Sequence, residues 1–133
     1  MKYKYGWLAG VIDGEGTITI TRQFRVKSYS YRPEIHITNT NRELLQEASR
    51  LIESATGKKT NLFATSNGSN RPVYRVRLQD RKSCLKLLKL LLPYLVGKKY
   101  QARVLLDFLS SNNRDSVAIQ AASIRNINAG SSC

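Results

Sequence analysis

Two acidic residues, Asp13 and Glu15, stand at the end of an apolar stretch that begins at Trp7 and is typical of a helix. The partial negative charge at the C-terminal end of a helix disfavours carboxylates there, unless a metal ion or a protonated group lies beside them. Paired carboxylates with open positions and water are the usual way in which proteins hold Mg²⁺ for phosphate chemistry. The stretch is therefore a candidate metal site for phosphodiester hydrolysis.

Gly10 and Gly14 are four residues apart on this predicted helix and share one face. Glycine costs about 1 kcal/mol relative to alanine inside a helix, and a close approach of two helices is the usual compensation. If two copies of the helix pack side by side, their carboxylates converge. The alternative is that Gly14 and Gly16 only form the helix C-cap and the following turn.

The charge balance indicates the kind of partner. The chain has 133 residues, which predicts a single domain over 1–128 and a flexible tail over 129–133. Its 22 Lys and Arg against 9 Asp and Glu give a net charge of +13, so nucleic acid, an anionic membrane surface and an acidic protein are the candidate partners. No apolar run reaches the roughly 18 residues of a membrane span.

Other classes of protein and site are excluded by simple counts. The 2 cysteines give neither a disulfide framework nor a zinc pattern, and the single histidine, His36, excludes a histidine-based metal site within one chain. Asp13 and Glu15 interrupt the first apolar run, so it is a poor export signal. We therefore expect an intracellular protein, in a prokaryotic cytoplasm or an organelle.

Four segments have the pattern of strands. Thr17–Lys27 alternates with period two, with Ile18, Ile20, Phe24 and Val26 on a core side that Arg22 interrupts. The segments 32–38 and 71–79 alternate in the same way, 60–66 is weaker, and 66–70 is a turn signal. Basic residues therefore gather on one face of two hairpins.

Helices are predicted over 3–13, from Thr40 or Asn41 to Gly57, and over 80–95, 98–111 and 112–128, with Pro93 ending or kinking the third. The order of elements predicts an α+β fold of the αββαββα type. Its antiparallel sheet would be covered by helices on one face and be open, polar and basic on the other.

The segment LAGVIDGEG, Leu8–Gly16, resembles the signature of the LAGLIDADG homing endonucleases and differs from it at Val11, Gly14 and Glu15. The segments HITNTNRELL and LPYLVGKKYQA follow where the family pattern places them, so the resemblance extends over roughly residues 5–110. A single copy of the motif resembles the homodimeric, often intron-encoded branch of the family. The resemblance implies a four-stranded saddle-shaped sheet, motif helices at the subunit interface, and site-specific double-strand cleavage of DNA.

The resemblance also implies a role for each matching residue. Glu15 matches the acid that binds the metal ion, and Gly14 matches the residue whose backbone carbonyl is a second ligand. The metal ion would be Mg²⁺ or Mn²⁺, and Ca²⁺ is expected to bind without supporting cleavage. Asn39 matches a polar residue that positions water, and Lys98, with Lys99 as its rival, matches a basic residue near the scissile phosphate. The implied dimer interface consists of Leu8, Gly10, Val11, Asp13 and Gly14. Asp13 is expected to be structural there, with hydrogen bonding across the interface.

Double-stranded DNA would be straddled by the homodimer, with strands in the major groove of each half-site and a pseudo-palindromic target of about 20 bp. The candidates for contacting DNA are Thr19, Thr21, Gln23, Arg25, Arg32, Glu34, His36, Arg75 and Arg77. A solvated strand position is the alternative for each residue, while the set as a whole favours DNA contact.

Two other functions stay in view. A non-cleaving nucleic-acid binder, such as an intron maturase that binds RNA, would use the same charge and the same sheet face. A structural protein such as a ribosomal-subunit binder would explain the charge but not the glycine and acid motif. Because acids that face phosphate bring no advantage to a protein that only binds, the endonuclease is favoured.

Overall fold

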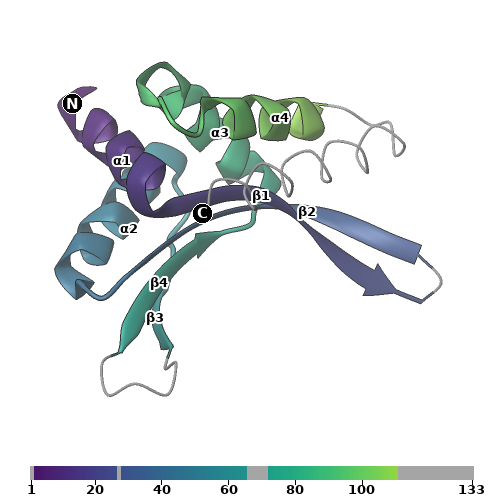
Figure 1. The fold of residues 1–133 in the computed structure, drawn as a ribbon, viewed down its shortest axis with the longest axis horizontal. Coiled ribbons are helices and arrows are strands. Elements are labelled where there is room, and N and C mark those ends of the chain that lie inside the picture. Colours follow the sequence, from purple (N-terminus) through teal and green to yellow (C-terminus); the bar gives the residue numbers. More distant parts are fainter. Residues whose placement is uncertain (1, 27, 66–71, 111–133) are drawn as a thin grey trace.

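The computed structural model describes residues 2–26, 28–65 and 72–110 (Figure 1). The elements follow in the order α1 (Lys2–Glu15), β1 (Gly16–Arg25), β2 (Ser28–Asn39), α2 (Arg42–Thr56), β3 (Leu62–Thr65), β4 (Val73–Leu78), α3 (Arg81–Leu91), the 3₁₀ turn η1 (Leu92–Tyr94) and α4 (Lys99–Ser110). This order confirms the predicted α+β class. The helix predicted over 112–128 and the tail predicted over 129–133 lie outside the described residues.

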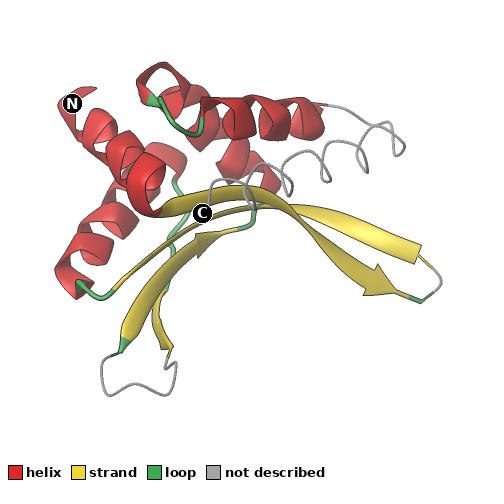
Figure 2. Cartoon of the chain, viewed as in Figure 1, coloured by secondary structure: helices red, strands yellow, loops and turns green. Residues whose placement is uncertain are grey.

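The four strands form one antiparallel sheet in the order β1-β2-β4-β3. The first strand of each hairpin, β1 or β3, therefore lies at an edge of the sheet. Figure 2 shows the described helices on one face of this sheet, while both hairpins bend away from them. The other face is concave and carries no described helix. The predicted antiparallel sheet with one covered face is therefore confirmed.

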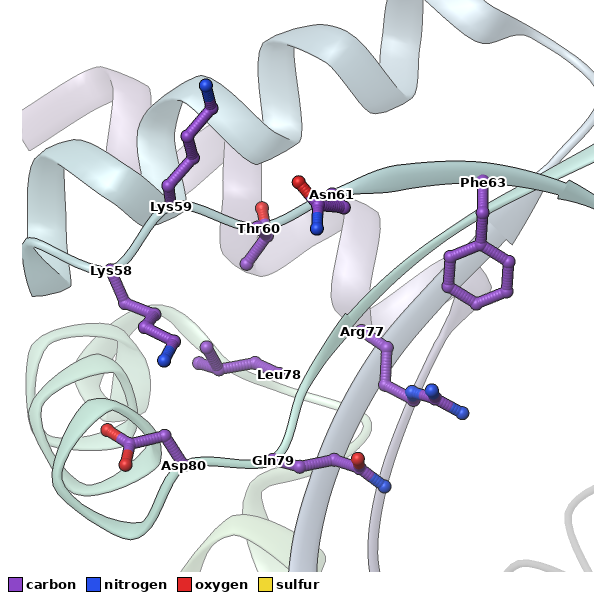
Figure 3. A pocket seen from close by; sticks show the side chains of 9 residues that line it. All are labelled: Lys58, Lys59, Thr60, Asn61, Phe63, Arg77, Leu78, Gln79 and Asp80. Atoms are coloured by element: carbon purple, nitrogen blue, oxygen red, sulfur yellow. The ribbon is translucent and has the colours of Figure 1, made fainter.

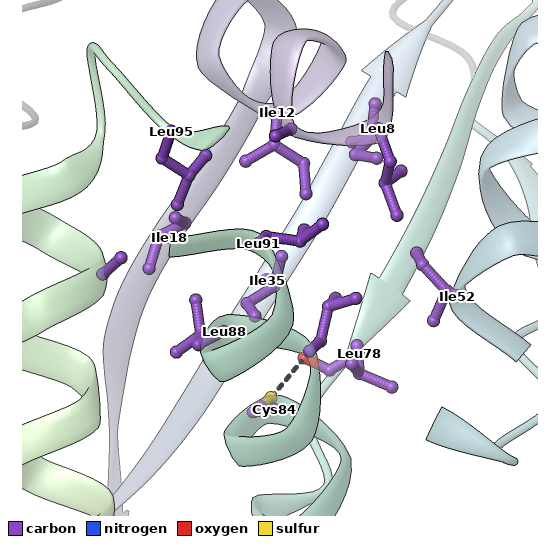
Figure 4. Packing of buried hydrophobic residues seen from close by; sticks show 14 of the residues in the cluster. Leu8, Ile12, Ile18, Ile35, Ile52, Leu78, Cys84, Leu88, Leu91 and Leu95 are labelled. Carbon is purple, nitrogen blue, oxygen red and sulfur yellow. Dashed lines mark hydrogen bonds between the residues drawn. The ribbon is translucent and has the colours of Figure 1, made fainter. Parts of the chain in front are cut away.

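The core lies between the sheet and the helices. The alternation of β1 and β2 places Ile18 and Ile35 on the covered face, where each is almost fully buried. Figure 4 shows these side chains in one cluster with Leu88 from α3 and Ile12 from α1. Cys84 is part of the same cluster, and burial raises the pKa of its thiol to about 12, so it is an inert packing residue.

The core is shorter than the strand pattern predicts. Phe24 and Val26, expected on the core side, are 70% and 89% exposed. They lie at the end of the β1–β2 hairpin, which extends past α4 in Figure 1, so no described helix covers them. The second strand is longer than the predicted segment 32–38, because β2 already begins at Ser28.

Local hydrogen bonds fix the start of the helices that back the sheet. Asn41, and not Thr40, caps α2 by accepting a bond from the Leu44 amide at 3.2 Å. Gly57 ends this helix with a positive φ of 76°. Asp80 caps α3 by accepting a bond from the Ser83 amide at 3.0 Å, and α3 passes into the η1 turn before Pro93.

Helix α1 runs two residues further than predicted and passes directly into β1. A side chain at Gly16 would place its Cβ 2.8 Å from the Cα atom of Ile12, so this sharp junction requires glycine. Gly14 lies inside the helix with open space beside it. Gly14 therefore does not form a turn, and Gly16 follows the helix directly as the first residue of β1.

Candidate functional site

The C-terminal end of α1 and the end of β2 bring Glu15 and Asn39 together. The side-chain amide of Asn39 donates to the Glu15 carboxylate. The Asn39 side-chain oxygen in turn accepts a bond from the Asn41 amide at 2.8 Å, at the start of α2. Both polar atoms of Asn39 are thus used, and the Glu15 carboxylate is held at an exposed position.

Asp13 ties α1 to the turn before α4. Its carboxylate accepts bonds from the backbone amides of Val96, at 2.7 Å, and Lys98, at 2.9 Å. These amides lie at the N-terminal side of α4, where the helix dipole favours negative charge. Asp13 is unfavourably placed at the C-terminal end of α1, but its carboxylate binds the amides that precede the N-terminal end of α4. These bonds lie within the chain, while the hydrogen bonds of Asp13 expected across an interface stay a prediction.

Lys98 is bound to the same end of α1. Its ammonium group donates to the backbone carbonyl of Asp13 at 2.7 Å, one residue before Gly14. This contact places Lys98 beside the end of α1 that carries Glu15. It therefore favours Lys98 over Lys99 as the basic residue expected near the scissile phosphate. The structure thus brings together Gly14 and Glu15 of α1, Asn39 at the end of β2 and Lys98 before α4, from three separate segments of the chain.

These groups suit a hard divalent cation. The carboxylate of Glu15 is exposed, and the carbonyl of Gly14 lies in the last helical turn, where carbonyls lack the usual intrahelical partner. Oxygen atoms of carboxylates, carbonyls and water are the ligands that Mg²⁺ prefers. Within residues 2–26, 28–65 and 72–110, no group of three His, Cys, Asp or Glu side chains could hold a metal ion. The candidate ligands in the described part of the chain are the Glu15 carboxylate and the Gly14 carbonyl.

The concave face of the sheet carries the polar residues predicted from alternation. The strand register puts Thr19 opposite Glu34, Thr21 opposite Arg32, and His36 between Thr17 and Arg77. The next position pairs Thr38 with Arg75. Gln23 and Arg25 belong to β1, but their side chains lie outside the described part of the chain.

Hydrogen bonds order part of this face. The Arg75 guanidinium donates to the Thr38 hydroxyl at 3.2 Å, and the Thr21 hydroxyl donates to the Arg32 carbonyl at 3.2 Å. Glu34 is only 9% exposed, so its carboxylate is not free to contact a partner directly. The hydrogen bond from His36 holds the pKa of Glu34 below its usual range, against the effect of burial.

The strand pattern missed a polar hollow at the β3 edge of this face (Figure 3). It has a volume of about 360 Å³ and is lined by Lys58, Lys59, Thr60, Asn61, Phe63, Arg77, Leu78, Gln79 and Asp80. The Arg77 guanidinium lies 5.4 Å from the centre of the Phe63 ring. The signal in the sequence was the pair of lysines directly after the helix-ending Gly57.

A family model described as a LAGLIDADG-like domain matches residues 2–91, which is more than half of the chain. The chain belongs to the LAGLIDADG homing endonuclease family. The match includes α1 with its motif and the entire sheet, and the described fold is the LAGLIDADG fold.

Solved LAGLIDADG structures agree with this assignment. The homing endonuclease I-CvuI, in complex with an I-CreI target in the presence of Mg, is 22% identical, with a TM-score of 0.77 over 92% of this chain and 80% of that chain. The archaeal intron-encoded homing endonuclease I-Vdi141I, complexed with DNA, is 19% identical, with a TM-score of 0.76 over 93% of this chain and 83% of that chain. At these identities the likeness shows the fold. A search of curated proteins found no significant match.

The LAGLIDADG helix has one exposed face. The exposed residues Tyr3, Trp7, Gly10 and Gly14 follow the spacing i, i+4, i+7 and i+11, which defines one helical stripe. Added Cβ atoms at Gly10 and Gly14 would meet nothing within 4 Å. Leu8 is fully buried in the core, so its predicted place in a dimer interface is wrong: its side chain packs within its own chain.

Val11 is half-buried and packs against the edge of the core, so only part of its side chain is open to a partner. None of the helices in the described ranges is both long and apolar enough to cross a membrane.

Proposed function

We propose that this chain is a site-specific endonuclease that hydrolyses both strands of duplex DNA with Mg²⁺ or Mn²⁺. One observation carries the proposal: the exposed carboxylate of Glu15 lies at the junction of α1 and β1 and is held there by Asn39, at the end of the neighbouring strand β2. The net charge of +13 suits a polyanionic partner. Solved relatives of the same fold are complexes with DNA, which supports this choice of partner.

Each residue of the site has a role in this proposal. Glu15 and the carbonyl of Gly14 would hold the ion, and a bound divalent ion activates water and stabilises a leaving oxygen. Asn39 keeps the Glu15 carboxylate in place and orients a water. Lys98 presents positive charge next to the phosphate while its ammonium remains tied to α1. The products would carry 5′-phosphate and 3′-hydroxyl ends.

The proposed active form is a homodimer. The described part of one chain supplies one exposed motif carboxylate, that of Glu15, because the Asp13 carboxylate is bonded to backbone amides. Cleavage of two strands requires two such sites. The exposed stripe of α1, with Gly10 and Gly14 at its centre, allows two helices to approach closely. Two copies related by a twofold axis would place two concave faces along one duplex, so the DNA site would be pseudo-palindromic and about two helical turns long.

The test is cleavage of a randomised DNA duplex library in the presence of Mg²⁺, with the ends sequenced. Wild-type protein should give ends that cluster at one nearly palindromic site. Glu15→Gln should abolish these ends while retaining binding, because the amide keeps the shape but loses the charge that holds the ion.

The control is Glu53→Gln, which makes the same chemical change at an exposed position on α2. It should cleave like the wild type. If neither wild type nor control produces ends, but both bind nucleic acid, the catalytic claim fails. Binding assays with structured RNA would then examine the maturase alternative.

A further inference from the structure

Three polar side chains on the concave face form a connected cluster. Glu34 and His36 are two residues apart on β2, so both side chains lie on the same side of the sheet. The Glu34 Oε2 atom is 2.9 Å from His36 Nδ1, and Glu34 Oε1 accepts a bond from Gln79 Nε2 at 2.8 Å. The side chains of Glu34 and His36 are 12% and 18% exposed.

The chemistry of Glu34 determines where the His36 proton lies. An ionised carboxylate only accepts hydrogen bonds, and both of its oxygens are engaged here. The bond from His36 lowers the pKa of Glu34, so the carboxylate is ionised at neutral pH. The short distance between Glu34 and His36 therefore requires a proton on Nδ1.

The position of this proton fixes the hydrogen-bonding role of the other ring nitrogen of His36, Nε2. A neutral imidazole carries only one proton, so Nε2 becomes a hydrogen-bond acceptor when Nδ1 is protonated. No partner for Nε2 occurs among the described residues. In the strand register His36 lies between Thr17 of β1 and Arg77 of β4, so Arg77 is the charged group that flanks it from a neighbouring strand.

We propose that Glu34 is a positioning residue that sets the base preference of His36, by fixing the Nδ1–H tautomer so that Nε2 accepts from an exocyclic amine in the major groove. Adenine N6 and cytosine N4 are the donors that this groove offers, whereas guanine and thymine present acceptors at the equivalent positions. This inference rests on the proposed DNA-binding function. It adds which bases His36 would recognise at one position of the DNA site. The preference for adenine or cytosine is about 5- to 10-fold, the ratio that one hydrogen bond supplies.

The tautomer can be measured directly without DNA. Because His36 is the only histidine of the chain, its ring nitrogens give an unambiguous ¹⁵N NMR signal. At about pH 8, where a histidine is ordinarily neutral, wild-type protein should show the Nδ1–H form. Glu34→Gln should give a mixture, since an amide can accept from Nδ1–H or donate to a bare Nδ1.

The matched control is Glu47→Gln, which makes the same change at a carboxylate on α2 that pairs with Arg50. It should leave the tautomer unchanged. An Nε2–H ring in wild-type protein would overturn the proposal, and this result does not depend on whether any variant folds.

Base preference is then measured by selecting duplexes from a library in Ca²⁺. Wild type should prefer adenine or cytosine at one position of each half-site, and Glu34→Gln should reduce that preference. In a His36→Ala background, Glu34→Gln should cause no further change, because Glu34 acts through the ring. A further change there would mean that Glu34 contacts the base itself, which contradicts the inference.

Failure of the proposed DNA-binding function would give a different result from failure of the inference about His36. If wild-type protein selects no duplex at all, the DNA-binding function fails and the base-reading role fails with it, whatever tautomer the ring shows. If wild type selects a site but Glu34→Gln has an identical preference at every position, only the present inference is overturned.

Discussion

Asn39 shows how much of the site depends on a single neutral side chain. Its amide has four hydrogen-bonding sites, and the two polar atoms connect the Glu15 carboxylate to the backbone at the start of α2. The orientation of the amide is fixed by this arrangement, because the oxygen must face the Asn41 amide and the nitrogen must face the carboxylate. The candidate metal ligand is therefore positioned by the cap region of a different helix.

Asn39→Ala should lower the cleavage rate by about 10- to 100-fold, the usual loss when a group that orients a metal ligand is removed. The loss should be partly recovered at high Mg²⁺, because the Glu15 carboxylate itself remains. The measurement is the cleavage rate as a function of Mg²⁺ concentration. Asn61→Ala, in the loop before β3, is the control and should leave this dependence unchanged; an identical effect of both variants would contradict the assigned role.

At the scale of elements, the junction between α1 and β1 decides where the site lies. The chain passes from helix to strand without a loop, so Glu15 ends the helix and Gly16 begins the strand. This direct passage places the last helical turn at the edge of the concave face. The cost is a backbone contact so close that position 16 has no room for a side chain.

Gly16→Ala should destabilise the fold by about 1–3 kcal/mol, because the new methyl group would overlap the backbone of Ile12, which cannot move without shifting the helix. Gly6→Ala is the matched control. It makes the same chemical change inside α1, where nothing lies within 4 Å, and should be neutral or stabilising by up to about 1 kcal/mol. Urea denaturation gives both values, and equal stabilities of the two variants would contradict this account of the junction.

At the scale of the whole molecule, α1 serves two surfaces at once. Leu8 and Ile12 face the core, while the stripe through Trp7, Gly10 and Gly14 faces outward. A helix with apolar residues on both sides is typical of a position between two packed bodies. The concave faces of two such chains would join into one extended basic surface.

Gly10→Ala should therefore separate chain stability from association. The substitution adds no clash within the chain and improves helix propensity, so the helix itself gains up to about 1 kcal/mol. The added methyl groups would hold two helices apart, so we expect self-association to weaken by about 10-fold or more. Sedimentation equilibrium over a range of concentrations measures this, and unchanged association would place the dimer interface elsewhere.

Much of this protein could be predicted from local patterns. Period-two alternation identified the strands and their polar face, because side chains of a strand point alternately to its two sides. The cap at Asn41 and the end at Gly57 followed from residue types with strong local preferences. The motif LAGVIDGEG indicated the candidate site, since acids are unfavourable at the C-terminal end of a helix and glycine is costly inside one.

Contacts between distant segments could not be predicted in this way. Periodicity tells which side of a strand is apolar but not how far the helices extend over it, so Phe24 was expected in the core. The resemblance implied that Leu8 lies in an interface, but a motif does not show which face of the helix packs within its own chain, and Leu8 is buried in the core.

The sequence by itself determined the fold class, the family resemblance and the candidate acid at Glu15, because these depend on local residue types and their spacing. Only the tertiary structure decided that Asp13 bonds to the turn before α4 and that Gln79 and His36 share the Glu34 carboxylate. These partners are brought together by the register of the sheet and the packing of the helices. Hydrogen bonds act over about 3 Å in space, and separation along the chain carries no information about that distance.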